Sequence, residues 1–135
     1  AVCNAAHMGG ALAETAAGRV LLLRAEEGSP ALTDALAAAG VPYDDIAVYR
    51  TIYDNPRSLA LREELEAGRF DYVTFTSAST VKGFVSAIGE DADFSRFTGL
   101  CIGKQTAGEA EKHHISVKTA GKAAIDALVE LALEK

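Results

Sequence analysis

Short apolar runs alternate with segments of helical periodicity along this chain, and the alternation limits the fold more than any other feature. The runs are almost continuous, as in strands that are buried on both faces of a sheet. Strands separated by helices pair in parallel through right-handed crossovers, with helices on both faces. The expected strands are 20–24, 46–50, 72–76, 99–102 and 115–117. The expected helices are 10–17, 31–39, 57–67, 79–88, 106–113 and 122–133.

Five consecutive βα units predict a three-layer α/β fold around one mostly parallel, five-stranded sheet. We expect the flavodoxin-like strand order 2-1-3-4-5. A length of 135 residues suits a single domain over 1–135, because a chain of about this size buries roughly two thirds of its unfolded surface. Within that domain, a leading helix is expected in 1–19, the first two strands in 20–50, and the last three βα units in 72–135.

Composition and charge exclude several classes of partner. Thirteen basic and nineteen acidic residues give a net charge of −6 without any run of Lys or Arg, which disfavours nucleic acid and anionic membranes. No apolar stretch approaches the ~20 residues that span a bilayer, and no signal peptide is evident. Cys3 and Cys101 are expected to be reduced thiols, with Cys101 buried in an apolar strand. These features predict a cytoplasmic protein with no membrane partner.

Two turns carry the clearest functional signal. The runs 75–81 (FTSASTV) and 102–107 (IGKQTA) each leave an apolar strand through small, hydroxyl or glycine residues and enter a helix. A helix start offers free backbone N–H groups and the positive end of the helix dipole, which together bind carboxylate or phosphate. Because ligands of open α/β sheets bind at the carboxyl ends of the strands, both turns are expected at one edge. The candidate binding residues are Ser77, Ala78, Ser79, Gly103, Lys104, Gln105 and Thr106.

Other α/β sites are disfavoured by missing motifs. No G-x-G-x-x-G follows the first strand, no Walker sequence occurs, and the third strand ends in Thr76-Ser77 where a receiver domain needs Asp. His113 and His114 are adjacent, so their side chains diverge on a helix and cannot share a metal as an i, i+4 pair can. The acidic turns 44–45 and 90–93 are read as solvated caps. We assign no metal and no cofactor.

The two turns, together with a third run before them, resemble a known family. Residues 75–84 and 101–107, preceded by Val48-Tyr49-Arg50-Thr51, resemble the C-terminal half of uroporphyrinogen-III synthase in order and spacing over nearly the whole chain. The resemblance implies a lyase of tetrapyrrole and haem biosynthesis that closes hydroxymethylbilane to uroporphyrinogen III. In that reaction the last pyrrole ring is inverted and water is lost, without a cofactor. The chain is about half as long as family members and opens on Ala1, so we expect a fragment of a two-domain parent that lacks the N-terminal half.

The resemblance also implies residue roles. Tyr49 is similar to the family tyrosine that assists loss of the terminal hydroxyl, and a phenol can hydrogen-bond or protonate that oxygen. Arg24, at the end of the first strand, can pair with a propionate or acetate of the substrate, and the two turns bind further carboxylates. A strand-end Tyr, a solvated Arg and ordinary helix caps are the structural alternatives for these residues.

Two questions stay open at this stage. The first is whether all five strands form one sheet or whether the first two strands belong to a separate domain, as they do in the family. A non-catalytic anion-binding or assembly module that lost its partner domain is the alternative function. A third and more generic candidate function is that of a nucleotide-binding flavodoxin-like domain.

Overall fold

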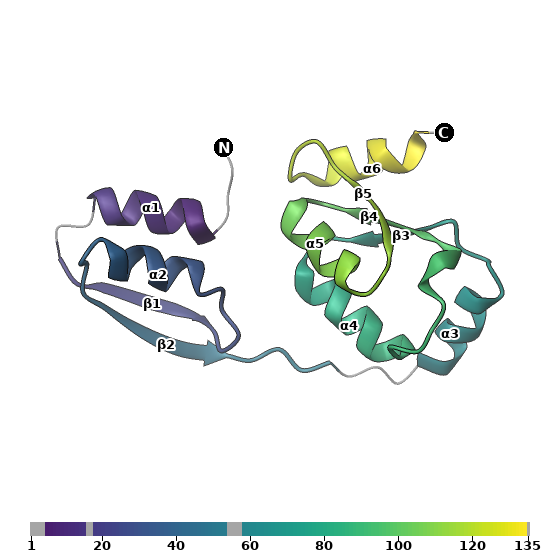
Figure 1. The fold of residues 1–135 in the computed structure, drawn as a ribbon, viewed down its shortest axis with the longest axis horizontal. Coiled ribbons are helices and arrows are strands. Elements are labelled where there is room, and N and C mark those ends of the chain that lie inside the picture. The colour runs from purple at the N-terminus through teal and green to yellow at the C-terminus, as the bar shows by residue number, and fades with distance from the viewer. Residues whose placement is uncertain (1–4, 16–17, 54–57, 135) are drawn as a thin grey trace. The chain divides into compact units, whose positions relative to one another are not determined.

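The chain divides into two compact units in a computed structural model that describes residues 5–15, 18–53 and 58–134. Unit 1 comprises Ala1–Ile52 and unit 2 comprises Tyr53–Lys135, and Figure 1 shows the elements of each. Parts of the predicted leading helix and the predicted helix start at Arg57 lie outside the described residues. Within those residues, no helix is long and apolar enough to cross a membrane.

Unit 1 is a two-stranded parallel sheet with helices packed on it. Its elements are α1 (Ala5–Thr15), β1 (Val20–Ala25), α2 (Ala31–Ala38) and β2 (Tyr43–Tyr49). The strands pair with Leu23 opposite Ile46, and Leu22 is buried with Leu32 and Leu36 of α2. The residues that alternate with Leu22 in β1 are Leu21 and Leu23, which are 58% and 60% exposed, so the helices cover only one face of this sheet.

Unit 2 is a three-stranded parallel sheet of order β3-β4-β5. Its elements are α3 (Ser58–Glu66), β3 (Tyr72–Phe75), α4 (Ala78–Ile88), a short 3-10 helix (Phe94–Arg96), β4 (Thr98–Cys101), α5 (Lys104–Lys112), β5 (Ser116–Thr119) and α6 (Ile125–Leu133). Each strand pairs with the next one along the chain, Tyr72 with Thr98 and Thr98 with Ser116. Helices therefore connect consecutive, adjacent strands, as the alternation predicts.

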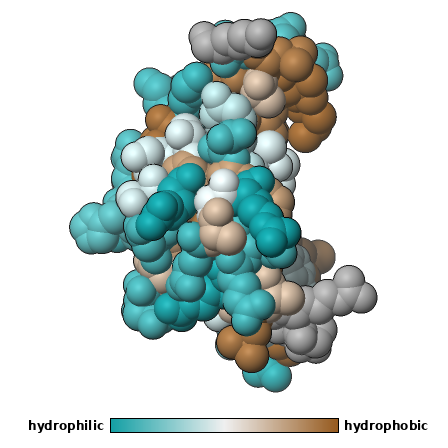
Figure 2. Space-filling view, turned by 90° about the vertical axis from the view of Figure 1, so that its right-hand side faces the viewer, coloured by the Kyte–Doolittle hydropathy of each residue, from teal (hydrophilic) through white to brown (hydrophobic). Residues whose placement is uncertain are grey.

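The two faces of the unit 2 sheet are covered unequally. One face buries Phe75 and Cys101 against apolar side chains of α3, α4 and α5. Phe84 of α4 is partly buried and packs against this cluster, with its ring centroid 5.4 Å from that of Phe75 and 5.7 Å from that of Phe97. The other face buries Leu100 with Ala127 and Leu128 of α6 and with Ala120 after β5. Figure 2 shows the exposed apolar area of α6 in brown at the top of the view. The larger core thus lies directly beneath the strand ends that lead into α4 and α5.

The predicted single sheet of order 2-1-3-4-5 is not what the described residues form. Their strands lie in two sheets, β1-β2 and β3-β4-β5. The α/β class and the parallel pairing are confirmed. The alternation of strands and helices is a local pattern, whereas the neighbour of a strand is decided by contacts far away in sequence. A run of five βα units therefore could not reveal the break after the second strand.

The end of α5 provides a stability prediction. His114 follows the helix with φ of 60°, the only positive φ of a non-glycine residue among those described. Its N–H donates to Glu111 O, and the Ile115 N–H donates to Ala110 O, as in a helix end that normally carries glycine. We expect His114→Gly to raise the free energy of unfolding by about 0.5–1 kcal/mol, because a left-handed conformation strains any residue with a Cβ.

Urea unfolding monitored by circular dichroism measures this change. The matched control is His113→Gly, one residue earlier, where φ is −99°. There glycine relieves no strain and only adds freedom to the unfolded chain, so the control should lose stability. Equal losses in both variants would contradict the strain argument.

Candidate functional site

The two turns predicted from the sequence lie side by side in unit 2. Phe75 at the end of β3 pairs with Cys101 at the end of β4, so the segments that follow these residues leave adjacent parallel strands at the same edge. The Ile102 N–H donates to Phe75 O at 3.0 Å and extends this pairing into the turn before α5. The starts of α4 and α5 thus lie next to each other at the carboxyl edge of the sheet, where α/β proteins bind ligands.

At the start of α4, side chains of the same turn accept hydrogen bonds from some of the free backbone N–H groups. Ser77 is the N-cap, and its Oγ accepts the Thr80 N–H at 3.2 Å while Thr80 Oγ1 accepts the Ser77 N–H at 3.2 Å. This reciprocal arrangement is a capping box. Ser79 Oγ lies 2.9 Å from Ser77 Oγ. The N–H groups of Ala78 and Ser79 remain as the backbone donors that the cap does not use.

The start of α5 is built differently. Its N-cap is Gly103, which has no side chain and makes no side-chain cap hydrogen bond. The backbone there is extended, with φ of −172°. The Ala107 N–H donates to Gly103 O, so the first turn contains the N–H groups of Lys104, Gln105 and Thr106, which precede that first helical bond. This turn therefore keeps more of its backbone N–H groups clear of side-chain caps than the α4 turn does.

Two side chains of the α5 turn differ in exposure. Lys104 is exposed, and a cation in the first turn of a helix opposes the helix dipole unless an anion is held there. Thr106 is only 4% exposed. A bound carboxylate would therefore contact the backbone of this turn and Lys104 more readily than the Thr106 hydroxyl. The roles predicted for these residues stay predictions.

The remaining predicted site residues lie in unit 1. Arg24 is near the end of β1, and its guanidinium Nε donates to Asp45 Oδ1 at 2.8 Å while Nη1 donates to Ser29 O at 2.6 Å. Hydrogen bonding to Arg24 lowers the pKa of the Asp45 carboxyl below its usual value. Tyr49 ends β2 and is 62% exposed, and its carbonyl accepts the Glu26 N–H at 2.9 Å. The structure thus pairs Arg24 internally and leaves the Tyr49 ring accessible.

Two residues at these sites were missed by the sequence reasoning. Thr80 completes the cap of α4, and the Ser-x-x-Thr spacing from Ser77 could have indicated it. Asp45 was read as a solvated turn residue, but it lies within β2 opposite Leu22 and pairs with Arg24. No local signal reveals that pairing, because it depends on the register of two strands.

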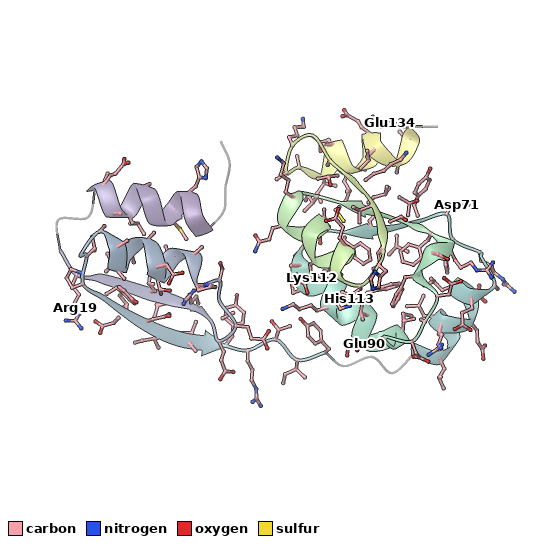
Figure 3. All side chains as sticks on the ribbon, viewed as in Figure 1. Arg19, Asp71, Glu90, Lys112, His113 and Glu134 are labelled. Atoms are coloured by element: carbon pink, nitrogen blue, oxygen red, sulfur yellow. The ribbon has the colours of Figure 1, made fainter. Side chains whose placement is uncertain are left out.

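A metal site finds no support among the described residues, which contain no group of three His, Cys, Asp or Glu side chains suited to an ion. His113 lies at the carboxyl end of α5 (Figure 3), away from the helix start that forms the candidate site. Its Nε2 is 3.8 Å from Glu109 Oε1, within the same helix.

Cys101 is buried as predicted, and this gives a second prediction. Desolvation, with a smaller contribution from Glu111, raises the pKa of its thiol to about 11. At pH 8 about one thiol in a thousand is then ionised, and only the thiolate reacts. We expect iodoacetamide to leave Cys101 unmodified in the folded protein and to modify it fully in guanidinium chloride. Peptide mapping reports Cys101 separately from Cys3; equal labelling with and without denaturant would be inconsistent with a buried thiol.

Comparison with known proteins places these features in a family. Residues 3–130 match the family model described as uroporphyrinogen-III synthase HemD. The porphyrin biosynthesis protein HemD of Ruminiclostridium josui is 33% identical over 116 residues, which are 86% of this chain and 23% of that protein. The crystal structure of uroporphyrinogen-III synthetase from Helicobacter pylori 26695 has 25% identity and a TM-score of 0.71, and the match covers 93% of this chain and 58% of that one.

A more distant structure agrees in fold. Thermus thermophilus uroporphyrinogen III synthase has 21% identity and a TM-score of 0.54 over 84% of this chain and 48% of that one. The chain therefore spans about half the length of the solved structures that it resembles. With the family model covering almost all of the chain, the conclusion is that this chain belongs to the uroporphyrinogen-III synthase family.

Proposed function

We propose that the parent of this chain is a uroporphyrinogen-III synthase, a lyase that converts hydroxymethylbilane to uroporphyrinogen III without a cofactor. The substrate loses its terminal hydroxyl as water and gives an azafulvene. A spiro intermediate then allows the last pyrrole ring to be inverted before the macrocycle closes. The chemistry needs the linear substrate to be held in one conformation, so positioning is the main catalytic contribution.

The observation that carries this proposal is the pair of adjacent helix starts at the ends of β3 and β4. Hydroxymethylbilane bears eight carboxylates, and the protein has a net charge of −6, so capture requires local positive potential. The first turn of α5 supplies backbone donors and Lys104, and the α4 turn supplies the N–H groups of Ala78 and Ser79. Preorganised backbone donors stabilise negative charge without reorganising.

The individual roles follow from position. Ser77, Ala78 and Ser79 bind one carboxylate group, and Gly103, Lys104, Gln105 and Thr106 bind another. Tyr49, exposed at the end of β2, hydrogen-bonds the leaving hydroxyl and assists its departure as water. Arg24 binds a propionate or acetate, which requires the carboxylate to compete with Asp45 for its guanidinium.

We further propose that the parent has two domains and acts in the cytoplasm. The division into two units after Ile52 supports separate domains better than one continuous sheet. The extra length of the solved relatives supports a parent chain of which these residues are a part.

The test is the product isomer formed from hydroxymethylbilane, separated by chromatography after oxidation to the porphyrin. We expect the full-length parent to give type III above the spontaneous background, which is type I. Residues 1–135 alone should give only that background, because the substrate-binding region is then incomplete. Type I alone from the parent would refute the synthase and leave the non-catalytic anion-binding module as the function.

A further inference from the structure

The guanidinium of Arg24 is held by three acceptors of unit 1. Its Nε donates to Asp45 Oδ1 at 2.8 Å, and its Nη2 donates to the other carboxylate oxygen of Asp45. Its Nη1 donates to Ser29 O at 2.6 Å. Pairing with both oxygens of a carboxylate fixes the plane of a guanidinium. Because the Arg24 and Asp45 side chains are only 22% and 33% exposed, the pair is a fixed part of unit 1.

This guanidinium also closes the loop between β1 and α2. A Cβ added to Gly28 would lie 2.6 Å from Arg24 Nη1, so the guanidinium rests directly on the Gly28 backbone. The Gly28 N–H donates to Ala25 O at 3.0 Å and forms a tight turn. Ser29, whose carbonyl Arg24 binds, precedes the N-cap of α2. The turn therefore fixes the first half of the loop, and Arg24 fixes the second half.

The same loop holds the main chain of Tyr49. The Glu26 N–H donates to Tyr49 O at 2.9 Å, so the loop lies beside the end of β2 (Figure 1). Within the described residues, β2 pairs with β1 alone. The backbone at the end of β2 thus depends on β1 and on the loop that follows it.

A bulge makes this dependence stronger. Arg24 lies opposite Ala47, whereas the next residue, Ala25, lies opposite Tyr49, so Val48 is an extra residue in β2. A bulge changes the direction of nearby side chains, and bulges are frequent next to active sites. The Tyr49 side chain is 62% exposed, so its direction is set by the backbone more than by packing.

The neighbouring pair, Arg19 and Asp44, shows what is particular to Arg24 and Asp45. Arg19 donates to both carboxylate oxygens of Asp44, at 2.6 and 2.7 Å. These side chains are 66% and 48% exposed, and the pair lies at the amino end of β1. Among the described residues, Arg19 donates to no loop carbonyl. The Arg19–Asp44 pair can therefore support strand pairing without reaching Tyr49.

We infer that Asp45 is a positioning residue for Tyr49. Its carboxylate orients Arg24, Arg24 closes the loop 26–29, and Glu26 in that loop holds the Tyr49 main chain beside the bulge. The phenol thereby keeps the direction in which it hydrogen-bonds the leaving hydroxyl. The inference rests on the role proposed for Tyr49 and assigns Asp45 an effect without substrate contact.

Asp45→Asn in the full-length parent is the first test. An asparagine cannot accept both hydrogen bonds from Arg24, so the loop should loosen and the phenol should lose its direction. We expect kcat for type III product to fall about tenfold, because small misplacements of a reacting group are costly. KM should change by about twofold or less, as for a group that acts in the transition state. The matched control, Asp44→Asn, removes the same charge from an equivalent pair and should keep the wild-type kcat.

Two kinetic results would overturn the inference. One is equal kcat for the Asp45 and Asp44 variants. The other is a lower KM with unchanged kcat in Asp45→Asn, because Asp45 would then only compete with the substrate for Arg24.

Tyr49→Phe distinguishes positioning from a general loss of structure. The phenol is absent from this variant, so adding Asp45→Asn should lower kcat by no more than about twofold further. A tenfold loss from Asp45→Asn in both backgrounds would mean that the substitution acts through the fold and would refute the positioning role.

Amide exchange measured by NMR tests the loop without relying on catalysis. The Glu26 amide should exchange about tenfold faster in Asp45→Asn and at the wild-type rate in Asp44→Asn. Unchanged exchange in Asp45→Asn overturns the inference. If the wild-type parent forms no type III product, the proposed function fails, and the Glu26 exchange rates still decide whether Asp45 holds the loop against Tyr49.

Discussion

Replacing Phe75 by alanine should lower the free energy of unfolding by about 3–5 kcal/mol. The side chain is 2% exposed and lies at the end of β3, where its ring meets Phe84 edge to face at 5.4 Å. Truncation removes buried apolar area and leaves a cavity that the surrounding strands and helices cannot fill. A loss of this size is a large part of the ~5–15 kcal/mol that stabilises most domains.

Urea unfolding followed by fluorescence and circular dichroism measures the effect. Phe70→Ala is the matched control, because Phe70 precedes the same strand and is 39% exposed. The control should cost markedly less, about 1–2 kcal/mol, because more than a third of its surface is already in water. A similar loss for both variants would mean that the core does not centre on Phe75.

Gly103→Asp should separate stability from the proposed activity in the full-length parent. An aspartate at this N-cap can accept a backbone N–H of the first turn and interacts favourably with the helix dipole, so unfolding should require about 0.5–1 kcal/mol more. The same carboxylate occupies the donors that we assign to the substrate and repels its carboxylates. We expect kcat/KM to fall by about thirtyfold, which corresponds to ~2 kcal/mol of lost binding.

The backbone conformation and the free space at Gly103 accommodate an aspartate without strain or a steric clash. Gly103 has φ of −172°, which any residue adopts, and a Cβ built there meets no atom within 4 Å. The matched control is Gly18→Asp, which adds the same charge at an exposed glycine before the amino end of β1, with no atom within 4 Å of its Cβ. Steady-state assays should show normal kcat/KM for the control. A loss of activity in both variants, or in neither, would count against an anion receptor at α5.

The sequence was most informative where structure is local. The starts of α4 and α5 were expected at 79 and 106 and lie at Ala78 and Lys104, because hydroxyl and glycine residues after an apolar strand end one element and begin the next. The burial of Cys101 followed from its apolar neighbours. These features depend on a few adjacent residues, so a single sequence is enough to indicate them.

Strand β2 shows where local reasoning failed. It was expected at 46–50 and spans Tyr43–Tyr49, because Asp44 and Asp45 were read as a turn. Arg19, at the amino end of β1 (Figure 3), donates to Asp44 at 2.6 Å, and Arg24 pairs with Asp45. Cross-strand ion pairs thus let two aspartates remain in a strand. Their partners lie more than twenty residues away, beyond any local pattern.

The two helix starts were predicted, but the difference between them was not. Ser77 and Gly103 were both predicted to begin helices, and the structure shows that Thr80 closes the α4 turn while the α5 turn has no side-chain cap. The sheet order failed for a related reason, since pairing between strands is decided over long distances. The proposed function rests on the family resemblance together with the two helix starts. The Asp45 carboxylate, which already accepts a hydrogen bond from Arg24, was not predicted from the sequence.

The chain-order pairing of β3, β4 and β5 has a kinetic consequence. Each pairing joins strands that are separated by only one helix, so the polymer loops that must close during folding are short. Folding speed falls as contacting residues become more distant in sequence, and unit 2 therefore has the connectivity of a relatively fast-folding parallel sheet.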